Sequence, residues 1–368
     1  MKFAGGLAVA LLLAACGSPQ AAGSTATPGT TAATTPSSVA SPTRTAAPQP
    51  SQPSTTPSVP AYFACEDART CPPLADIAMA FDPVRDEIVT FGGSYHSGPV
   101  TDETWRFRDG RWAQLHPAHV PPPRIDTVLV FDAAHGVVVM YGGSGVPASA
   151  AAGTGGDVGG ITFAADTWTW DGSDWTEQHP AHRPVPFIPD GTYDYARNQI
   201  VLLGFDRQME TWTYDGTDWT HRTNADGKPD PPRRQVWLSF DSASQTVVTF
   251  GGHNDGGADV SAVWEWDGQT WGETAAKSPP VQYFGPMAPE LDRAGMLIYN
   301  PLLILPTSTW RWNGTTFEQL QPGHAPALAV EWLQPDPPRH RLLLFGYSPE
   351  RQFQVWSWSG QDWTQITV

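Results

Sequence analysis

The pattern of hydrophobic and polar residues along this chain repeats six times. In its clearest copy, residues 167–175 (TWTWDGSDW), large aromatic residues alternate with small ones before an Asp-Gly pair. Alternation with a period of two is typical of a β-strand, and Asp-Gly favours a tight hairpin turn. The outer aromatic pairs, always seven residues apart, are Trp105 with Trp112, Trp168 with Trp175, Trp212 with Trp219, Trp264 with Trp271, Trp310 with Phe317, and Trp356 with Trp363. The pattern predicts a hairpin in every copy, with Asp109-Gly110 as the turn of the first.

Each hairpin follows two further apolar segments, which completes a unit of four predicted strands. In the first unit these segments are residues 77–82 (IAMAFD) and 87–93 (EIVTFGG). The second is a continuous apolar run, which suits a strand covered on both faces. The hairpins begin 44 to 63 residues apart, and this spacing fits one propeller blade per unit. The sequence therefore predicts an all-β fold, a six-bladed β-propeller of four-stranded blades over residues 75–368.

A glycine pair ends the second apolar segment in several units, for example Gly92-Gly93 and Gly251-Gly252. An apolar strand that ends in Gly-Gly and is followed by an aromatic hairpin resembles the kelch and galactose-oxidase central-domain family. The resemblance implies a kelch-like propeller. A galactose-oxidase-like activity would also imply copper and a Tyr-Cys crosslink, whereas all three cysteines lie before the blades.

The chain before the repeats begins with Lys2 and an apolar run that ends in Leu13-Ala14-Ala15-Cys16. This run is too short to span a bilayer, so it is interpreted as an export signal. Leu-Ala-Ala-Cys resembles the lipobox of bacterial lipoproteins, which implies removal of residues 1–15 and lipidation of Cys16. The alternative is an ordinary signal peptide with an incidental cysteine. We expect an extracytoplasmic protein that a lipid anchors to the bacterial cell membrane.

Two segments connect this anchor to the propeller. Residues 16–60 are almost wholly Ser, Thr, Pro, Ala, Gly and Gln, and this composition predicts a disordered linker because it offers little apolar surface to bury. Residues 61–74 form a lead-in that contains Cys65 and Cys71. A local disulfide between them is predicted for an oxidising compartment, with two free thiols as the alternative. We expect the lead-in to cover the seam between the first and sixth blades, which close the ring without exchanging strands.

The net charge of −16 argues against nucleic acid and against electrostatic docking on anionic lipid. Membrane contact is therefore expected only through the lipidated Cys16. We expect the protein to be a monomer.

Two sets of polar residues recur with the blades. An aspartate follows each first strand, and its constant position predicts an Asx turn, with calcium binding as the alternative. The six are Asp82, Asp132, Asp194, Asp241, Asp292 and Asp336. His-Pro-Ala-His occurs at residues 116–119 and 179–182, with a vestige at His324. Inheritance with the repeat explains this motif, and zinc or copper binding is the alternative.

The connections between second and third strands vary from 5 to 23 residues, whereas the turns on the opposite face are nearly constant. Variable loops on a constant scaffold favour a binding site. The candidate ligand-binding residues on this varied-loop face are Tyr95, His96, Arg207, His253, Asp255 and Asp259. Solvated polar loops, or a metal site that combines His253, Asp255 and Asp259 with His96, are the alternatives.

We recognise no complete catalytic set, so we predict no catalytic residues, no metal and no cofactor. The predicted function is binding of a protein or glycan of the cell envelope without catalysis. The alternative is an extracytoplasmic enzyme, either copper oxidase-like or a glycan hydrolase. We also expect the first ring of each pair, such as Trp264, to fill the gap to the neighbouring blade.

Overall fold

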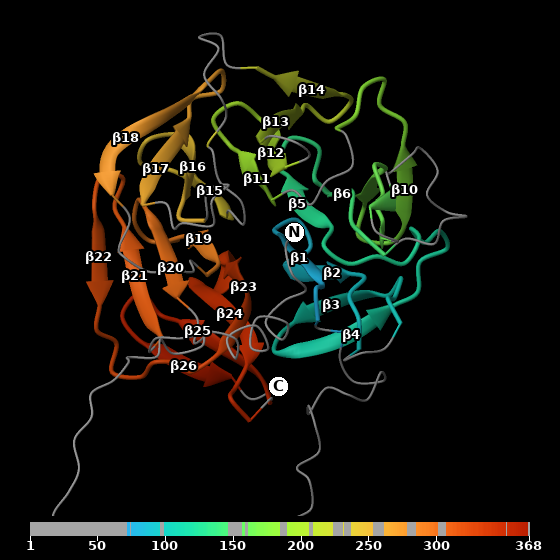
Figure 1. Ribbon diagram of the computed structural model, residues 1–368. Helices are drawn as coiled ribbons and strands as arrows, with labels where there is room; N and C mark the ends of the chain where they lie inside the picture. Colours follow the sequence, from blue (N-terminus) through green and yellow to red (C-terminus); the bar gives the residue numbers. More distant parts are fainter. Residues whose placement is uncertain are drawn as a thin grey trace, which may run out of the picture.

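The computed structural model describes residues 72–73, 75–95, 99–145, 157–158, 161–184, 190–205, 209–223, 231, 237–252, 261–277, 285–300, 307–350 and 352–366. These residues form six four-stranded antiparallel sheets arranged as blades around a central axis (Figure 1). The predicted six-bladed β-propeller is therefore confirmed. Among the described residues, the one helical element is a 3-10 turn, η2 (Pro337–Arg339).

Every blade uses four strands in chain order, apart from a short ribbon, β7 (Asp157–Val158) and β8 (Ile161–Thr162), within blade 2. Blades 1 to 3 consist of β1 (Ala78–Asp82), β2 (Glu87–Phe91), β3 (Thr104–Arg108), β4 (Arg111–Leu115); β5 (Val128–Asp132), β6 (Val137–Tyr141), β9 (Thr167–Trp170), β10 (Trp175–Gln178); β11 (Asp190–Asp194), β12 (Gln199–Phe205), β13 (Met209–Tyr214), β14 (Trp219–Arg222). Blades 4 to 6 consist of β15 (Trp237–Asp241), β16 (Thr246–Phe250), β17 (Ala262–Trp266), β18 (Trp271–Lys277); β19 (Met287–Pro289), β20 (Met296–Asn300), β21 (Ser308–Trp312), β22 (Phe317–Leu320); β23 (Ala329–Asp336), β24 (Arg341–Tyr347), β25 (Phe353–Trp358), β26 (Trp363–Ile366).

The first strand of each blade lies beside the first strands of both neighbours, and these six strands surround the axis (Figure 1). β23 of the last blade packs beside β1, so the ring closes without strand exchange, as predicted. The lead-in that was expected to cover this seam lies almost wholly outside the described residues.

The hydrophobic core consists of six clusters, one at each boundary between neighbouring blades. Successive residues of a second strand serve different clusters because side chains alternate across a strand. Ile88 faces the boundary with blade 6, and Val89 faces the boundary with blade 2. The continuous apolar runs in the sequence follow from this burial on both faces.

The prediction for Trp264 is only partly correct. In five blades the first ring of the motif is half-buried, and Trp105 of blade 1, 1% exposed, is the exception. The most deeply buried rings are the next aromatic residue of the third strand and the ring that opens the fourth, such as Trp266 and Trp271. Trp271 lies directly opposite Trp266 across the hairpin. Both rings therefore point into the same boundary cluster.

The ring that opens a fourth strand also donates a hydrogen bond to the preceding blade. Trp219 Nε1 lies 2.9 Å from Thr167 Oγ1, and the same bond joins Trp175 to Thr104, Trp271 to Thr211 and Trp363 to Thr309. This contact explains why threonine precedes the first tryptophan of the motif. At the boundary of blades 4 and 5 both partners have changed together, because Phe317 faces Val263 in one cluster.

The turns are partly as predicted. Asp82, Asp132, Asp194 and Asp241 form Asx turns, in which a carboxylate oxygen accepts backbone N–H groups two or three residues later. Asp336 differs, since its carboxylate instead accepts hydrogen bonds from Arg339 and Arg341. The first hairpin is as predicted: Asp109-Gly110 is a two-residue turn with both φ angles positive. In blade 2, by contrast, Asp171 begins a four-residue loop between Trp170 and Trp175.

Candidate functional site

Of the six predicted ligand-binding residues, the structure describes Tyr95. Its hydroxyl donates a 2.8 Å hydrogen bond to Glu103 Oε2, which also accepts one from Trp105 Nε1. Tyr95 is thereby tied to the repeated hairpin. The other five, His96, Arg207, His253, Asp255 and Asp259, lie outside the described residues, as do Cys16, Cys65 and Cys71.

The chain enters the propeller on the varied-loop face. Ala75 pairs with Ser94 immediately after the Gly92-Gly93 pair, where the connection between second and third strands begins. The linker that precedes the fold therefore joins it on the face that carries the predicted site.

A buried ion pair supports this face in blade 2, and the sequence analysis did not identify it. Arg124 is fully buried and makes two hydrogen bonds to the Asp166 carboxylate, of 2.6 and 2.8 Å. Its other N–H groups donate to the carbonyl oxygens of Gly142 and Pro122. Burial raises the pKa of Asp166, but the hydrogen bonds and charge of Arg124 outweigh this effect and keep that pKa below its usual value.

The last histidine of the His-Pro-Ala-His motif has a structural role. His119 meets Asp174 in the hairpin turn of the next blade, with its backbone N–H and Nδ1 at 2.8 and 2.7 Å from the carboxylate. His182 with Asp218 and His324 with Asp362 repeat this contact. Inheritance with the repeat therefore explains the motif. Within the described ranges, no group of three or more His, Cys, Asp and Glu residues could hold a metal ion.

Basic side chains connect neighbouring blades on the opposite face, called here the turn face. Arg85 pairs with Asp82 of its own blade and lies over Gly172 in the hairpin turn of blade 2. Gly172 has a φ of 95°, and a Cβ there would overlap the Arg85 side chain. His135 covers Gly216 and Arg197 covers Gly268 in the same way. Glycine at each of these positions allows the positive φ of its own turn and leaves room for the side chain from the neighbouring blade.

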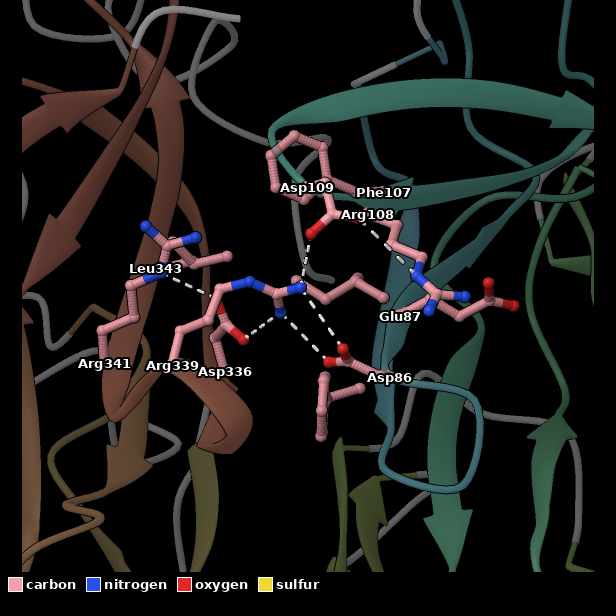
Figure 2. A pocket seen from close by; sticks show the side chains of 11 residues that line it. Asp86, Glu87, Phe107, Arg108, Asp109, Asp336, Arg339, Arg341 and Leu343 are labelled. Atoms are coloured by element: carbon pink, nitrogen blue, oxygen red, sulfur yellow. Dashed lines mark hydrogen bonds and ion pairs between the residues drawn. The ribbon is translucent and has the colours of Figure 1, made fainter.

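The seam between blades 6 and 1 differs, and a small cleft opens there on the turn face. Arg339 of blade 6 lies between Asp336 of its own blade and Asp86 and Asp109 of blade 1 (Figure 2). The corresponding distances are 2.8, 3.1 and 2.5 Å. Hydrogen bonds to Asp336 and Asp86 raise the pKa of Arg339 above its usual value. These ion pairs join blade 6 to blade 1 across the cleft and so contribute to closing the ring.

The clearest departure from the repeat lies at the varied-loop ends of the first strands. Nine residues after the repeated aspartate, each of the second strands of blades 1 and 2 carries an apolar residue whose partners on the first strands are the buried Ala78 and Val128. The same position is partly exposed in blades 3, 4 and 6, where it is occupied by Asp190, Trp237 and Trp332. We call these three residues the axial set.

The axial set combines aromatic surface with polar groups. Trp237 and Trp332 border boundary clusters, but their indole N–H groups have no hydrogen-bond partner within the described part of the chain. Asp190 Oδ2 accepts a 2.5 Å hydrogen bond from the backbone N–H of Leu238 and so links blades 3 and 4. The predicted Arg207 and His253 belong to the connections that leave these two blades on this face. These three positions stand out only when they are compared with the same position in the other blades.

Comparison with known proteins supports the fold. No protein-family model matches the chain, and no curated protein matches it. A solved structure described as "Structure of YjhT" covers 81% of this chain and 99% of its own, with 12% identity and a TM-score of 0.55. A second, "Structure of SapL1 lectin in complex with alpha methyl fucoside", covers 82% of this chain and 97% of its own, with 14% identity and a TM-score of 0.53. Both similarities concern the propeller architecture.

Proposed function

We propose that this chain is an exported, lipid-anchored, kelch-like propeller that binds a glycan or protein of the cell envelope without catalysis. The axial set carries the proposal, because it replaces buried aliphatic residues with half-exposed tryptophans and a carboxylate on an otherwise repetitive scaffold. Indole rings supply apolar contact area together with a hydrogen-bond donor, and both suit ligand recognition.

Two further observations support this location. The connections of blades 3 and 4, which hold the predicted Arg207, His253, Asp255 and Asp259, begin just beyond the residues opposite Asp190 and Trp237. One propeller of similar fold is a lectin in complex with a fucoside, so the architecture is compatible with sugar binding. The described chain has no helix long and apolar enough to cross a membrane, and we propose attachment through Cys16.

The test compares three forms of the protein on an array of envelope glycans and in capture from an envelope extract. Wild type is compared with an Asp190→Asn, Trp237→Leu double variant and with Gln269→Ser, an exposed position in the blade 4 hairpin turn on the turn face. We expect the double variant to lose capture and Gln269→Ser to keep it, after thermal unfolding confirms that all three are folded. Equal capture by the double variant, or capture lost only by Gln269→Ser, would contradict the proposed site.

Membrane attachment is tested separately, because binding does not depend on it. We expect Cys16→Ala to leave the detergent phase and to remain unprocessed. Unchanged partitioning would contradict lipid anchoring and leave the binding proposal intact.

A further inference from the structure

The turn face carries exposed apolar side chains around the axis. They lie in the turns between first and second strands, and six such turns surround the axis because the first strands pack side by side. We call this set the hub: Pro83, Val84, Ala133, Ala134, Tyr195, Ala196, Ala243, Ala294 and Pro338. Val84 and Tyr195 are 65% and 55% exposed, and Val120 is the other large hydrophobic residue exposed among those described.

The polar groups beneath the hub are already paired. Asp82 and Asp194 are fully buried and accept hydrogen bonds from their own turns and from Arg85 and Arg197. These arginines also donate to carbonyl oxygens of the neighbouring turn, at Gly136 and Gln245. Arg85 and Arg197 are therefore held in the scaffold. An incoming partner meets the apolar side chains of the hub together with exposed polar side chains of the same turns, among them Ser242, Arg293 and His340.

Tyr195 is held in a fixed orientation. Its ring contacts Tyr193 and Phe240 edge to face, with centroid distances of 4.9 and 5.4 Å. The other blades carry Pro, Ala, Ser or Arg at this position, so the repeat does not require an aromatic residue here. A rigid, exposed tyrosine loses little conformational entropy on binding, which favours its use at an interface.

Carboxylates border the hub on the same face in blades 2, 3, 4 and 6. They lie in the outer hairpin turns and form what we call the rim: Asp171, Asp174, Asp215, Asp218, Asp267 and Asp362. Three of them, Asp174, Asp218 and Asp362, also contact histidines of the preceding blade. Contact of Arg85 with Gly172 and of Arg197 with Gly268 shows that hub turns and rim turns adjoin. Hydrogen bonding from Ser173 lowers the pKa of Asp171, and for Asp215 and Asp267 hydrogen bonds within the turn outweigh burial, so the pKa of each lies below its usual value. The rim therefore stays ionised at neutral pH.

We infer that the turn face is a second docking surface, and that its partner is a protein segment with an apolar centre and surrounding positive charge. Charge complementarity selects this partner, because a second copy of this chain would oppose its rim with another and carries a net charge of −16. Anionic lipid is disfavoured for the same reason. The described chain enters the propeller on the opposite face, at Ala75.

The test uses an amphipathic helical Leu/Lys peptide as the probe and an oligolysine of equal charge as its comparison. We expect the amphipathic peptide to bind wild type more tightly, and Val84→Ser with Tyr195→Ser to weaken its binding about tenfold. Val120→Ser, which removes an exposed valine away from the hub, should leave binding unchanged. Thermal unfolding identifies any variant that has lost its fold.

The rim is tested with Asp171→Asn and Asp215→Asn, which should weaken binding of both peptides and reduce its salt dependence. Equal binding of oligolysine and the amphipathic peptide, or wild-type binding by the hub double variant, would overturn the inference. Either result would show a charge effect without apolar docking.

Discussion

The boundary between blades 2 and 3 and the seam between blades 6 and 1 achieve the same packing by different means. At the first, Trp219 donates to Thr167, His182 contacts Asp218, and His135 covers Gly216. At the seam, Val355 takes the place of the threonine, and the Nε1 of Trp112 is buried without a hydrogen-bond partner.

Ion pairs stand at the seam in place of the tryptophan–threonine hydrogen bond. Arg339 connects Asp336 to Asp86 and Asp109, and the apolar cluster below it contains Phe107 and Phe345. An unpaired buried donor costs free energy, while ion pairs near a surface contribute little. The comparison indicates that a boundary depends on both members of the tryptophan–threonine pair. A boundary that lacks one member of the pair is expected to be the weaker one.

The largest effect is expected at the tryptophan of the intact boundary. Trp219→Ala should lower the free energy of unfolding by about 3 to 5 kcal/mol, because it removes a fully buried ring. The matched variant Trp112→Ala should cost clearly less, since Trp112 is half-buried and its indole lacks an acceptor. Urea unfolding measures both, and equal losses would show that the two boundaries are equivalent.

The next effect concerns the hydrogen bond itself. Thr167→Val should destabilise the protein by about 1 to 3 kcal/mol, because Trp219 Nε1 would be left buried and unpaired. The reverse change at the seam, Val355→Thr, should stabilise it by about 1 kcal/mol by giving Trp112 an acceptor. If Val355→Thr destabilises the protein as much as Thr167→Val does, the paired-residue interpretation is wrong.

A smaller effect is expected from the charges of the seam. Arg339→Met should cost about 1 to 2 kcal/mol, discounted for its partial exposure and because Asp336 retains Arg341. Its contribution should shrink at high salt. Arg111→Met in blade 1 is the control, since that side chain is exposed, and a similar loss there would remove any special role for Arg339.

The smallest effect is a pH dependence at the histidine contacts. Hydrogen bonds from the His182 backbone and side chain lower the pKa of Asp218 in the folded state. The resulting stabilisation is therefore present above the unfolded pKa of about 4 and is lost as pH falls through the lower folded pKa. Asp218→Asn should flatten the fall in melting temperature over this acid range. A melting profile that follows wild type below pH 4 would contradict this account.

Much of the fold could be predicted from the sequence because its signals are local. Alternating aromatic residues, Asp-Gly turns and continuous apolar runs each specify a strand or turn within a few residues, and their sixfold repetition specifies the number of blades. The Asx turns at Asp82, Asp132, Asp194 and Asp241 are local in the same sense.

Contacts between blades could not be predicted, because they join residues far apart in the sequence. The partnership of Trp219 with Thr167, the cover of Gly172 by Arg85 and the burial of Arg124 with Asp166 all depend on how neighbouring sheets pack. The greater burial of Trp266 than of Trp264 has the same origin.

By itself the sequence determined the strands, the turns and the number of blades, because each depends on neighbouring residues and on a period along the chain. Only the tertiary structure decided which polar groups are paired within the scaffold and which first-strand positions depart from the repeat. It placed the His-Pro-Ala-His motif among the scaffold contacts and singled out Asp190, Trp237 and Trp332 near the axis. The physical reason is that the burial and pairing of a side chain depend on the neighbouring blade, and the pattern and spacing of residues along the chain do not specify those contacts.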